Sequence, residues 1–104
     1  MLVAFSVAPS VSRSDDTEDG SVSEAVAAAV RVVRESGLPN RTSSMFTELE
    51  GEWDEVMDVV KQAVDVVAAV SPRVGLVLKA DIRPGRTGEM TAKLERLEQA
   101  LNEG

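Results

Sequence analysis

The residue types in this 104-residue chain suit ligand binding better than catalysis. The chain has no histidine and no cysteine, which removes the commonest general base near neutral pH, thiolate nucleophiles and zinc–thiolate sites. The carboxylates of Glu50 and Glu52 alternate sides of a strand or straddle a turn, so their spacing does not predict an acid–base pair. We therefore expect a protein that is not an enzyme and that has no metal and no cofactor, with a cofactor-free enzyme as the catalytic alternative.

The charge balance points to the class of partner. The chain has 18 acidic and 11 basic residues, which gives a formal net charge of −7. The phosphate backbones of nucleic acids bind surfaces with clustered Lys and Arg. Because this chain is acidic, we expect no nucleic-acid partner. The separated cations Lys79, Arg83 and Arg86 are more typical of solvated or ion-paired side chains than of a phosphate site. A cationic small molecule is favoured instead.

The run Leu49–Val56 carries the only tryptophan across an expected junction between a strand and a helix. Glu50, in this run, and Asp81 are candidate ligand-binding acids, although a solvated strand end or an ion pair is the commoner role for a single carboxylate. Trp53 could stack on a ligand. It also begins an apolar helical stripe, and this position favours packing in the core.

A second group of candidates lies in the strands and at a turn. Met45 and Phe46 form an apolar pair at an expected turn, where they could contact a ligand or another subunit. Ser6, Ser43 and Thr47 could donate hydrogen bonds from the strands to a ligand, although small hydroxyl residues are also ordinary strand formers.

Hydrophobic periodicity divides the chain into strands and helices. The expected elements are a strand over residues 1–9, a helix opened by a capping box at Ser21–Glu24, two short strands within 40–51 joined near 44–46, a helix over 53–70, a strand over 74–83 and a helix from about 89. Residues 10–20 have the composition of a flexible acidic loop.

This order predicts one α+β domain over residues 1–104, a ferredoxin-like βαββαβ sandwich with an additional C-terminal helix. Right-handed crossovers place both main helices on one face of the sheet. The first strand is apolar on both sides, so the other face should meet a ligand or a second subunit. The last helix has a narrow stripe that favours helix pairing, formed by Met90, Leu94, Leu97 and Leu101. We therefore expect a dimer or tetramer assembled through the sheet and the C-terminal helix.

Several short motifs have a familiar order and spacing. They are Ser6–Pro9, Ser21–Ser23, Gly37–Pro39, Leu49–Val56 and Lys79–Gly85. The most specific combination is the run Glu50–Glu55 followed by the alternating Lys79, Asp81 and Arg83. Through these motifs, over most of its length, the chain resembles the small thiamine-binding, YkoF-like proteins of ferredoxin-like fold.

The resemblance implies homodimers or tetramers built through sheets, and binding of thiamine or its pyrimidine moiety without catalysis. Thiamine presents a cationic thiazolium and an aminopyrimidine, so its site needs a carboxylate, an aromatic or sulfur face and hydroxyl groups. The predicted ligand-binding residues are Ser6, Ser43, Met45, Thr47, Glu50, Trp53 and Asp81. The chain departs from the family pattern in lacking glycine at Val11 and Phe46, a Gly-Pro pair at Ser43-Ser44 and an aromatic residue at Ala25.

The leading hypothesis is a cytoplasmic, homo-oligomeric, non-catalytic protein that binds thiamine or its hydroxymethylpyrimidine moiety at the open sheet face or a subunit interface. No membrane association is expected, because the apolar first nine residues lack a basic leader and are too short to cross a bilayer. The alternative is a structural or regulatory assembly module without a ligand. A binding pocket should leave a hole lined by polar side chains, whereas a pure interface should be filled.

Overall fold

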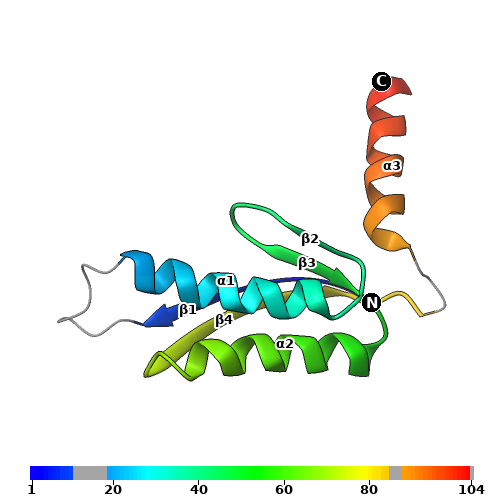
Figure 1. Cartoon of the computed structure of the whole chain (residues 1–104). Helices are drawn as coiled ribbons and strands as arrows, with labels where there is room; N and C mark the ends of the chain where they lie inside the picture. Colours follow the sequence, from blue (N-terminus) through cyan, green and yellow to red (C-terminus); the bar gives the residue numbers. More distant parts are fainter. Residues whose placement is uncertain (11–18, 85–87, 104) are drawn as a thin grey trace.

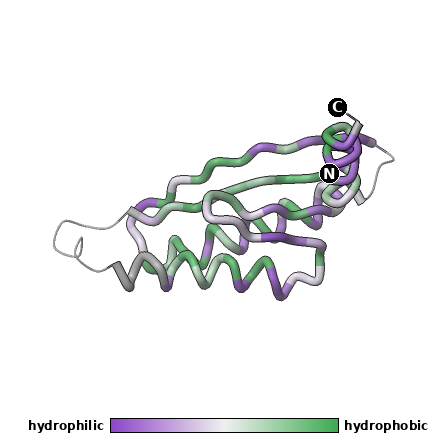
Figure 2. Tube along the Cα trace, turned by 90° about the horizontal axis from the view of Figure 1, so that it is seen from above, coloured by the Kyte–Doolittle hydropathy of each residue, from purple (hydrophilic) through white to green (hydrophobic). Residues whose placement is uncertain are grey.

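The sheet and two of the helices form two layers (Figure 1). The computed structural model describes residues 1–10, 19–84 and 88–103. The elements are β1 (Leu2–Ser10), α1 (Asp19–Glu35), β2 (Asn40–Thr42), β3 (Thr47–Glu50), α2 (Trp53–Ala68), β4 (Arg73–Asp81) and α3 (Glu89–Glu103). The strands form one antiparallel sheet in the order β2-β3-β1-β4, and α1 and α2 cover one of its faces (Figure 2). This confirms the predicted ferredoxin-like α+β fold with an additional C-terminal helix.

Strand β1 lies inside the sheet and organises both of its faces. It pairs with β4 along all nine of its residues, but with β3 only from Leu2 to Phe5. Because side chains alternate along a strand, Val3 and Phe5 point toward α1 and α2, while Leu2 and Ala4 point to the other face. We call that second face, which α1 and α2 do not cover, the open face.

The core fills the space between the sheet and the two covering helices. Its sheet residues Val3, Phe5 and Leu49 are almost completely buried. The buried core residues are Val3, Phe5, Ala25, Ala29, Val33, Leu49, Val56, Val59, Val60, Ala63 and Val67. Alanines on both α1 and α2 let these helices approach each other closely above the sheet.

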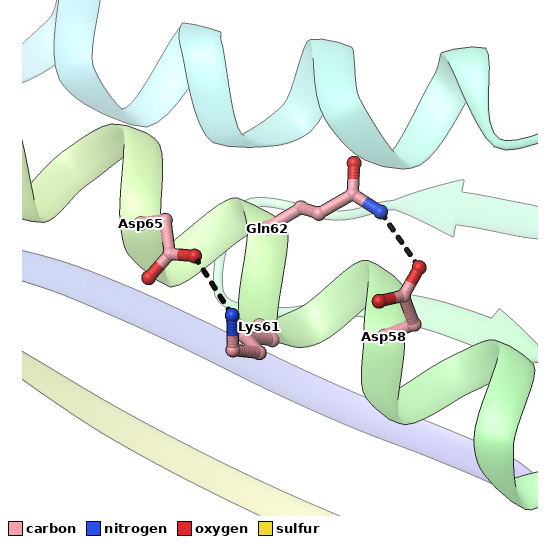
Figure 3. Close-up of polar contacts among 4 residues, drawn as sticks. All are labelled: Asp58, Lys61, Gln62 and Asp65. Carbon is pink, nitrogen blue, oxygen red and sulfur yellow. Dashed lines mark hydrogen bonds and ion pairs between the residues drawn. The ribbon is translucent and has the colours of Figure 1, made fainter.

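The solvent-facing side of α2 carries polar pairs spaced by one helical turn (Figure 3). Gln62 Nε2 donates a hydrogen bond to Asp58 Oδ2 at 2.8 Å, and Lys61 Nζ forms an ion pair with Asp65 Oδ2 at 3.4 Å. Such pairs at i and i+4 add modest stability to a helix, mainly at its exposed surface. The valines and alanine on the opposite side supply the packing.

Trp53 is not part of the core, which corrects the prediction that core packing is its main role. It is the first residue of α2, and its side chain is 55% exposed. The backbone N–H of Glu52, just before it, donates to Glu55 Oε1 at 3.1 Å, so the helix start is fixed by polar contacts. The buried side of α2 begins one turn later, at Val56. It continues through Val59, Val60, Ala63 and Val67.

The start of α1 also differs from the prediction. The helix is already formed at Asp19, so the capping box expected at Ser21–Glu24 lies within the helix and that part of the prediction is wrong. The predicted flexible loop has other limits as well, because Ser10 belongs to β1 and Asp19 and Gly20 belong to α1. The rest of that predicted loop, 11–18, lies outside the described residues.

Helix α3 extends away from the two-layer body and is anchored at its first turns (Figure 1). Met90 is buried, and its backbone N–H donates to Glu50 Oε1 at 3.2 Å. Lys93, one turn further, forms an ion pair with Asp81 at the end of β4. Leu94 and the later leucines of α3 are exposed. The radius of gyration is accordingly 15.7 Å, whereas a compact chain of this length would have about 13 Å.

The ion pair with Lys93 affects the ionisation of Asp81. The pKa of the Asp81 carboxyl lies below its ordinary value of 3.8, chiefly because the Lys93 side chain donates a hydrogen bond to it. Desolvation opposes this shift, and the positive charges of Lys93, Arg83 and Lys79 add to it. The contact between α3 and β4 is therefore at full strength above pH 3.8 and is lost as the pH falls through the lowered pKa of Asp81.

A matched pair of valines tests the core. We expect Val56→Ala to lower the free energy of unfolding by about 2 kcal/mol, because it removes two buried methyl groups and leaves a cavity. Val70→Ala, at a side chain that is 72% exposed, should change it by less than about 0.5 kcal/mol. Urea unfolding followed by circular dichroism measures both, and equal effects would contradict the assigned core.

The anchoring of α3 can be tested through the titration of Asp81. Following its carboxyl carbon by NMR, we expect a midpoint below 3.8 in the unmodified protein and a higher midpoint in Lys93→Met, which lacks the hydrogen-bond donor. Lys61→Met is the matched control, because Lys61 pairs with Asp65 on α2 instead. An Asp81 midpoint that does not move in Lys93→Met would rule out the ion pair.

Candidate functional site

The structure divides the predicted ligand-binding residues between two places. Ser6, Ser43, Met45 and Thr47 line one cavity. Glu50 and Asp81 lie together at the other end of β1, where both flank Leu2 in the register of the sheet. Trp53 follows Glu50 at the start of α2 and does not line the cavity.

The cavity lies between α1, β1 and the loop that joins β2 to β3, and we call it the hairpin cavity. Its volume is about 210 Å³. The lining residues are Phe5, Ser6, Val7, Val26, Ala29, Val30, Thr42, Ser43, Ser44, Met45, Phe46 and Thr47. Because it is bounded by α1, it lies on the helix-covered side of the sheet. The hypothesis had placed a ligand on the open face or at a subunit interface.

The unequal lengths of β1 and β3 explain why a cavity forms here. Strand β3 begins at Thr47, opposite Phe5, so β1 continues past its neighbour on that side. At Ser6 and Val7 the edge of β1 that would continue toward β3 faces the hairpin cavity. The β2–β3 loop bends over this space but does not fill it. Backbone N–H and C=O groups at such an edge are well placed to bind a flat polar molecule.

Ser43 holds the loop in shape. Its backbone N–H donates to the Phe46 carbonyl at 2.8 Å, and its hydroxyl donates to the same oxygen at 3.0 Å. Its Oγ also accepts from the N–H groups of Met45 and Phe46, at 3.3 and 3.1 Å. These bonds keep the apolar pair Met45 and Phe46 at the mouth of the cavity. Ser43 therefore positions the loop, in addition to any contact with a ligand.

The hairpin cavity is neutral as far as its described lining goes. The described lining residues combine aromatic, aliphatic and thioether side chains with hydroxyl groups, and none of them is acidic or basic. Thr47 is the buried hydroxyl residue of this lining. Such a surface can enclose an uncharged ring and bind its polar edge. It offers no counter-charge for a cation.

The two candidate acids are already engaged by α3. Glu50 is buried and accepts the backbone N–H of Met90, while Asp81 pairs with Lys93. The ion pair that was expected as the commoner role of a single carboxylate is present at Asp81, with Lys93 as the partner. Leu2, which lies between the acids, is four residue steps along β1 from Ser6 at the cavity, or about 13 Å at about 3.3 Å per residue. The acids and the hairpin cavity form separate sites.

A second, more open hollow of about 340 Å³ lies between α1 and α2. Its lining includes the carboxylates of Glu35, Glu55 and Asp58. Two of these already accept hydrogen bonds within α2 or its first turn, Glu55 from the Glu52 N–H and Asp58 from Gln62. The hollow is thus a solvated groove between two helices, and two of its three carboxylates are engaged in hydrogen bonds within α2 or at its start.

Several lining residues escaped the sequence-based prediction. None of the predicted ligand-binding residues lies in α1, although Val26, Ala29 and Val30 of this helix form one wall of the hairpin cavity. Their helical spacing predicts a buried face but cannot separate the part that meets β1 from the part that passes beside the hairpin. Thr42 and Ser44 were missed because a turn of small polar residues has no distinctive pattern.

Among residues 1–10, 19–84 and 88–103, no group of three or more acidic side chains is arranged to hold a metal ion. Within the same part of the chain, none of the helices combines the length and the apolar character that crossing a bilayer requires.

Known proteins with similar sequences cover almost the whole chain. A UPF0045 protein of Mycobacterium bovis is 52% identical over 102 residues, which are 97% of this chain and 94% of the relative. A UPF0045 protein of Synechocystis is 34% identical over 82 residues, 78% of this chain and 68% of the relative.

Solved structures show the same fold. A hypothetical protein of Methanocaldococcus jannaschii superposes with a TM-score of 0.79 at 29% identity, over 93% of this chain and 94% of the other. A candidate thiamine biosynthesis/salvage protein of Thermotoga maritima gives 0.72 at 27% identity, over 90% and 96%. Residues 3–98 match the family described as thiamine-binding protein. The chain therefore belongs to the thiamine-binding protein family.

Proposed function

We propose that this protein is a non-catalytic binding protein for thiamine or its hydroxymethylpyrimidine moiety, and that the pyrimidine ring occupies the hairpin cavity. Membership of the thiamine-binding protein family supports the ligand class. The observation that carries the location is the neutral, hydroxyl-bearing lining beside the free edge of β1. In this proposal the protein works in the cytoplasm as a homo-oligomer.

The chemistry of the ligand fits this lining. An aminopyrimidine has a ring nitrogen next to an amino group, so it presents an acceptor and a donor side by side. The backbone edge at Ser6 and Val7 presents the complementary groups, and Thr47 adds a buried hydroxyl. Phe5, Phe46 and Met45 supply aromatic and sulfur faces against which a flat ring can pack.

The size and charge of the cavity favour the pyrimidine over the complete vitamin. Pockets for drug-sized ligands usually start near 300 Å³, whereas this one measures about 210 Å³. The described lining residues would give a buried thiazolium cation no counter-charge, and an unpaired buried charge is costly. We therefore place the thiazolium of bound thiamine outside the cavity, in solvent, where the net charge of −7 still favours a cation.

Departures from the family pattern affect this site directly. Ser43, Ser44 and Phe46 line the hairpin cavity, and Ala25 is buried in the core beside it. Val11 lies outside the described residues. The replacement of a Gly-Pro pair and a glycine therefore changes side chains that line the proposed site.

A structural or regulatory assembly module without a ligand is the second candidate. The observation in its favour is the exposed apolar surface of α3, which serves no purpose in a monomer. The hairpin cavity favours the binding function instead, since it is a hole with polar groups in its wall.

Calorimetric titration tests the proposed ligand. We expect hydroxymethylpyrimidine to bind at submillimolar concentration, and to bind at least as tightly as thiamine. Thr47→Val should weaken it about threefold to tenfold, as expected for the loss of one hydrogen bond in a buried site. Thr91→Val, on the exposed surface of α3, is the matched control and should leave affinity unchanged. Absence of heat with both ligands would refute the binding function.

The single tryptophan tests the location. Trp53 lies next to the candidate acid Glu50 and away from the hairpin cavity. We expect its fluorescence to stay nearly constant while hydroxymethylpyrimidine saturates the protein. Strong quenching that follows the binding isotherm would place the ligand at the Glu50 end of the sheet and contradict the assignment to the cavity.

A further inference from the structure

The four methionines of this chain differ sharply in exposure, and all four lie in the part of the chain that the structure describes. The side chain of Met45 is 73% exposed. Met90 is buried, and Met1 and Met57 are partly buried. Oxidation of a methionine depends on access of the oxidant to the sulfur. Met45 is therefore the thioether that an oxidant in solvent reaches first.

The position of Met45 couples this sulfur to the hairpin cavity. Met45 lies in the loop between β2 and β3 and belongs to the cavity lining. Its backbone N–H donates to Ser43 Oγ at 3.3 Å, and the N–H of Phe46 donates to the same oxygen at 3.1 Å. None of these bonds involves the sulfur, so the loop keeps its shape when the sulfur is modified. A modified Met45 thus remains in the wall that a ligand meets.

We propose that Met45 is a modification site, and that its oxidation to methionine sulfoxide by a peroxide weakens ligand binding in the hairpin cavity. The thioether sulfur attacks one oxygen of hydrogen peroxide. The S–O bond forms as the O–O bond breaks, and the second oxygen leaves with both protons as water. The sulfur is oxidised and the peroxide is reduced, so the step needs no further reactant. The chain has no cysteine, so no thiol of its own competes for the oxidant.

The sulfoxide affects the ligand-bound state more than the free protein. In the free protein the Met45 side chain is mostly in solvent, so water hydrogen-bonds to the new S=O group and the fold is unchanged. A flat ring that packs against Met45 removes this water, and the face of a pyrimidine has no donor to replace it. Desolvation of a polar group without a new hydrogen bond is costly. The thioether, by contrast, packs favourably against a ring.

The modification is reversible in principle, which makes it suitable for regulation. Methionine sulfoxide reductases return the sulfoxide to the thioether, and the exposed position of Met45 gives such an enzyme access. The effect on binding rests on the proposed function. The selective oxidation of Met45 does not, since it follows from exposure alone.

Peptide mapping by mass spectrometry tests the selectivity. During a brief treatment with hydrogen peroxide, we expect Met45 to gain one oxygen at least about threefold faster than Met57, and Met90 to react slowest. The circular dichroism of the oxidised protein should be unchanged. Equal rates at Met45 and Met57, or unfolding of the protein by the oxidation of Met45, would overturn the proposal.

Calorimetric titration with hydroxymethylpyrimidine tests the effect on binding. We expect the oxidised protein to bind at least about threefold more weakly than the untreated protein, and a methionine sulfoxide reductase to restore the affinity. In Met45→Leu, whose apolar side chain has a similar volume, peroxide should leave the variant's own affinity unchanged. Met57→Leu is the matched control and should lose affinity on treatment as the unmodified protein does.

The outcomes separate this inference from the proposed function. Equal affinity of the untreated and the oxidised protein would overturn the inference alone. The same holds if peroxide weakens binding by Met45→Leu as much as by the unmodified protein. Absence of heat from the untreated protein would refute the proposed function, and with it the effect of oxidation on binding.

Discussion

The length of β1 is the constraint on which the rest of the structure depends. Among the strands that the structure describes, it pairs with both β3 and β4 from Leu2 to Phe5 and with β4 alone from Ser6 onward. Where it is paired on both sides, its inward side chains build the core with α1 and α2. Where one side is free, the loop between β2 and β3 leaves the hairpin cavity. A single mismatch in strand length thus separates the part of the sheet that gives stability from the part that can bind a ligand.

The same strand explains why the two candidate acids do not join that cavity. Glu50 and Asp81 flank its first residues, at the fully paired end, and they hold the first turns of α3. The buried carboxylate of Glu50 accepts the Met90 N–H of α3, and the partly exposed carboxylate of Asp81 pairs with Lys93 of α3. The acids therefore position a helix. The proposed pyrimidine site is left with neutral groups, which suit an uncharged ring.

Much of the fold could be predicted from local patterns. The strands expected within 40–51 are β2 and β3, and the helix expected over 53–70 is α2, which ends two residues earlier at Ala68. The role of Trp53 was misjudged because helical periodicity shows only the side of the helix on which a residue lies. It does not show whether another strand or helix packs against the first turn, where Trp53 is exposed. The start of α1 was misjudged because an acidic, glycine-containing run resembles a loop although Asp19 and Gly20 are helical.

The candidate site was predictable only in part, for a geometric reason. The hydroxyl and thioether residues of the hairpin could be identified by residue type. The contribution of α1 to the cavity could not, because it depends on how many residues β1 extends beyond the start of β3, and no local sequence pattern encodes that length difference.

The most direct test of the pyrimidine site is a crystal structure grown with hydroxymethylpyrimidine. We expect ligand density between α1, the edge of β1 at Ser6 and Val7, and the loop at Met45. Density beside Glu50 and Asp81, with the hairpin cavity empty, would contradict it.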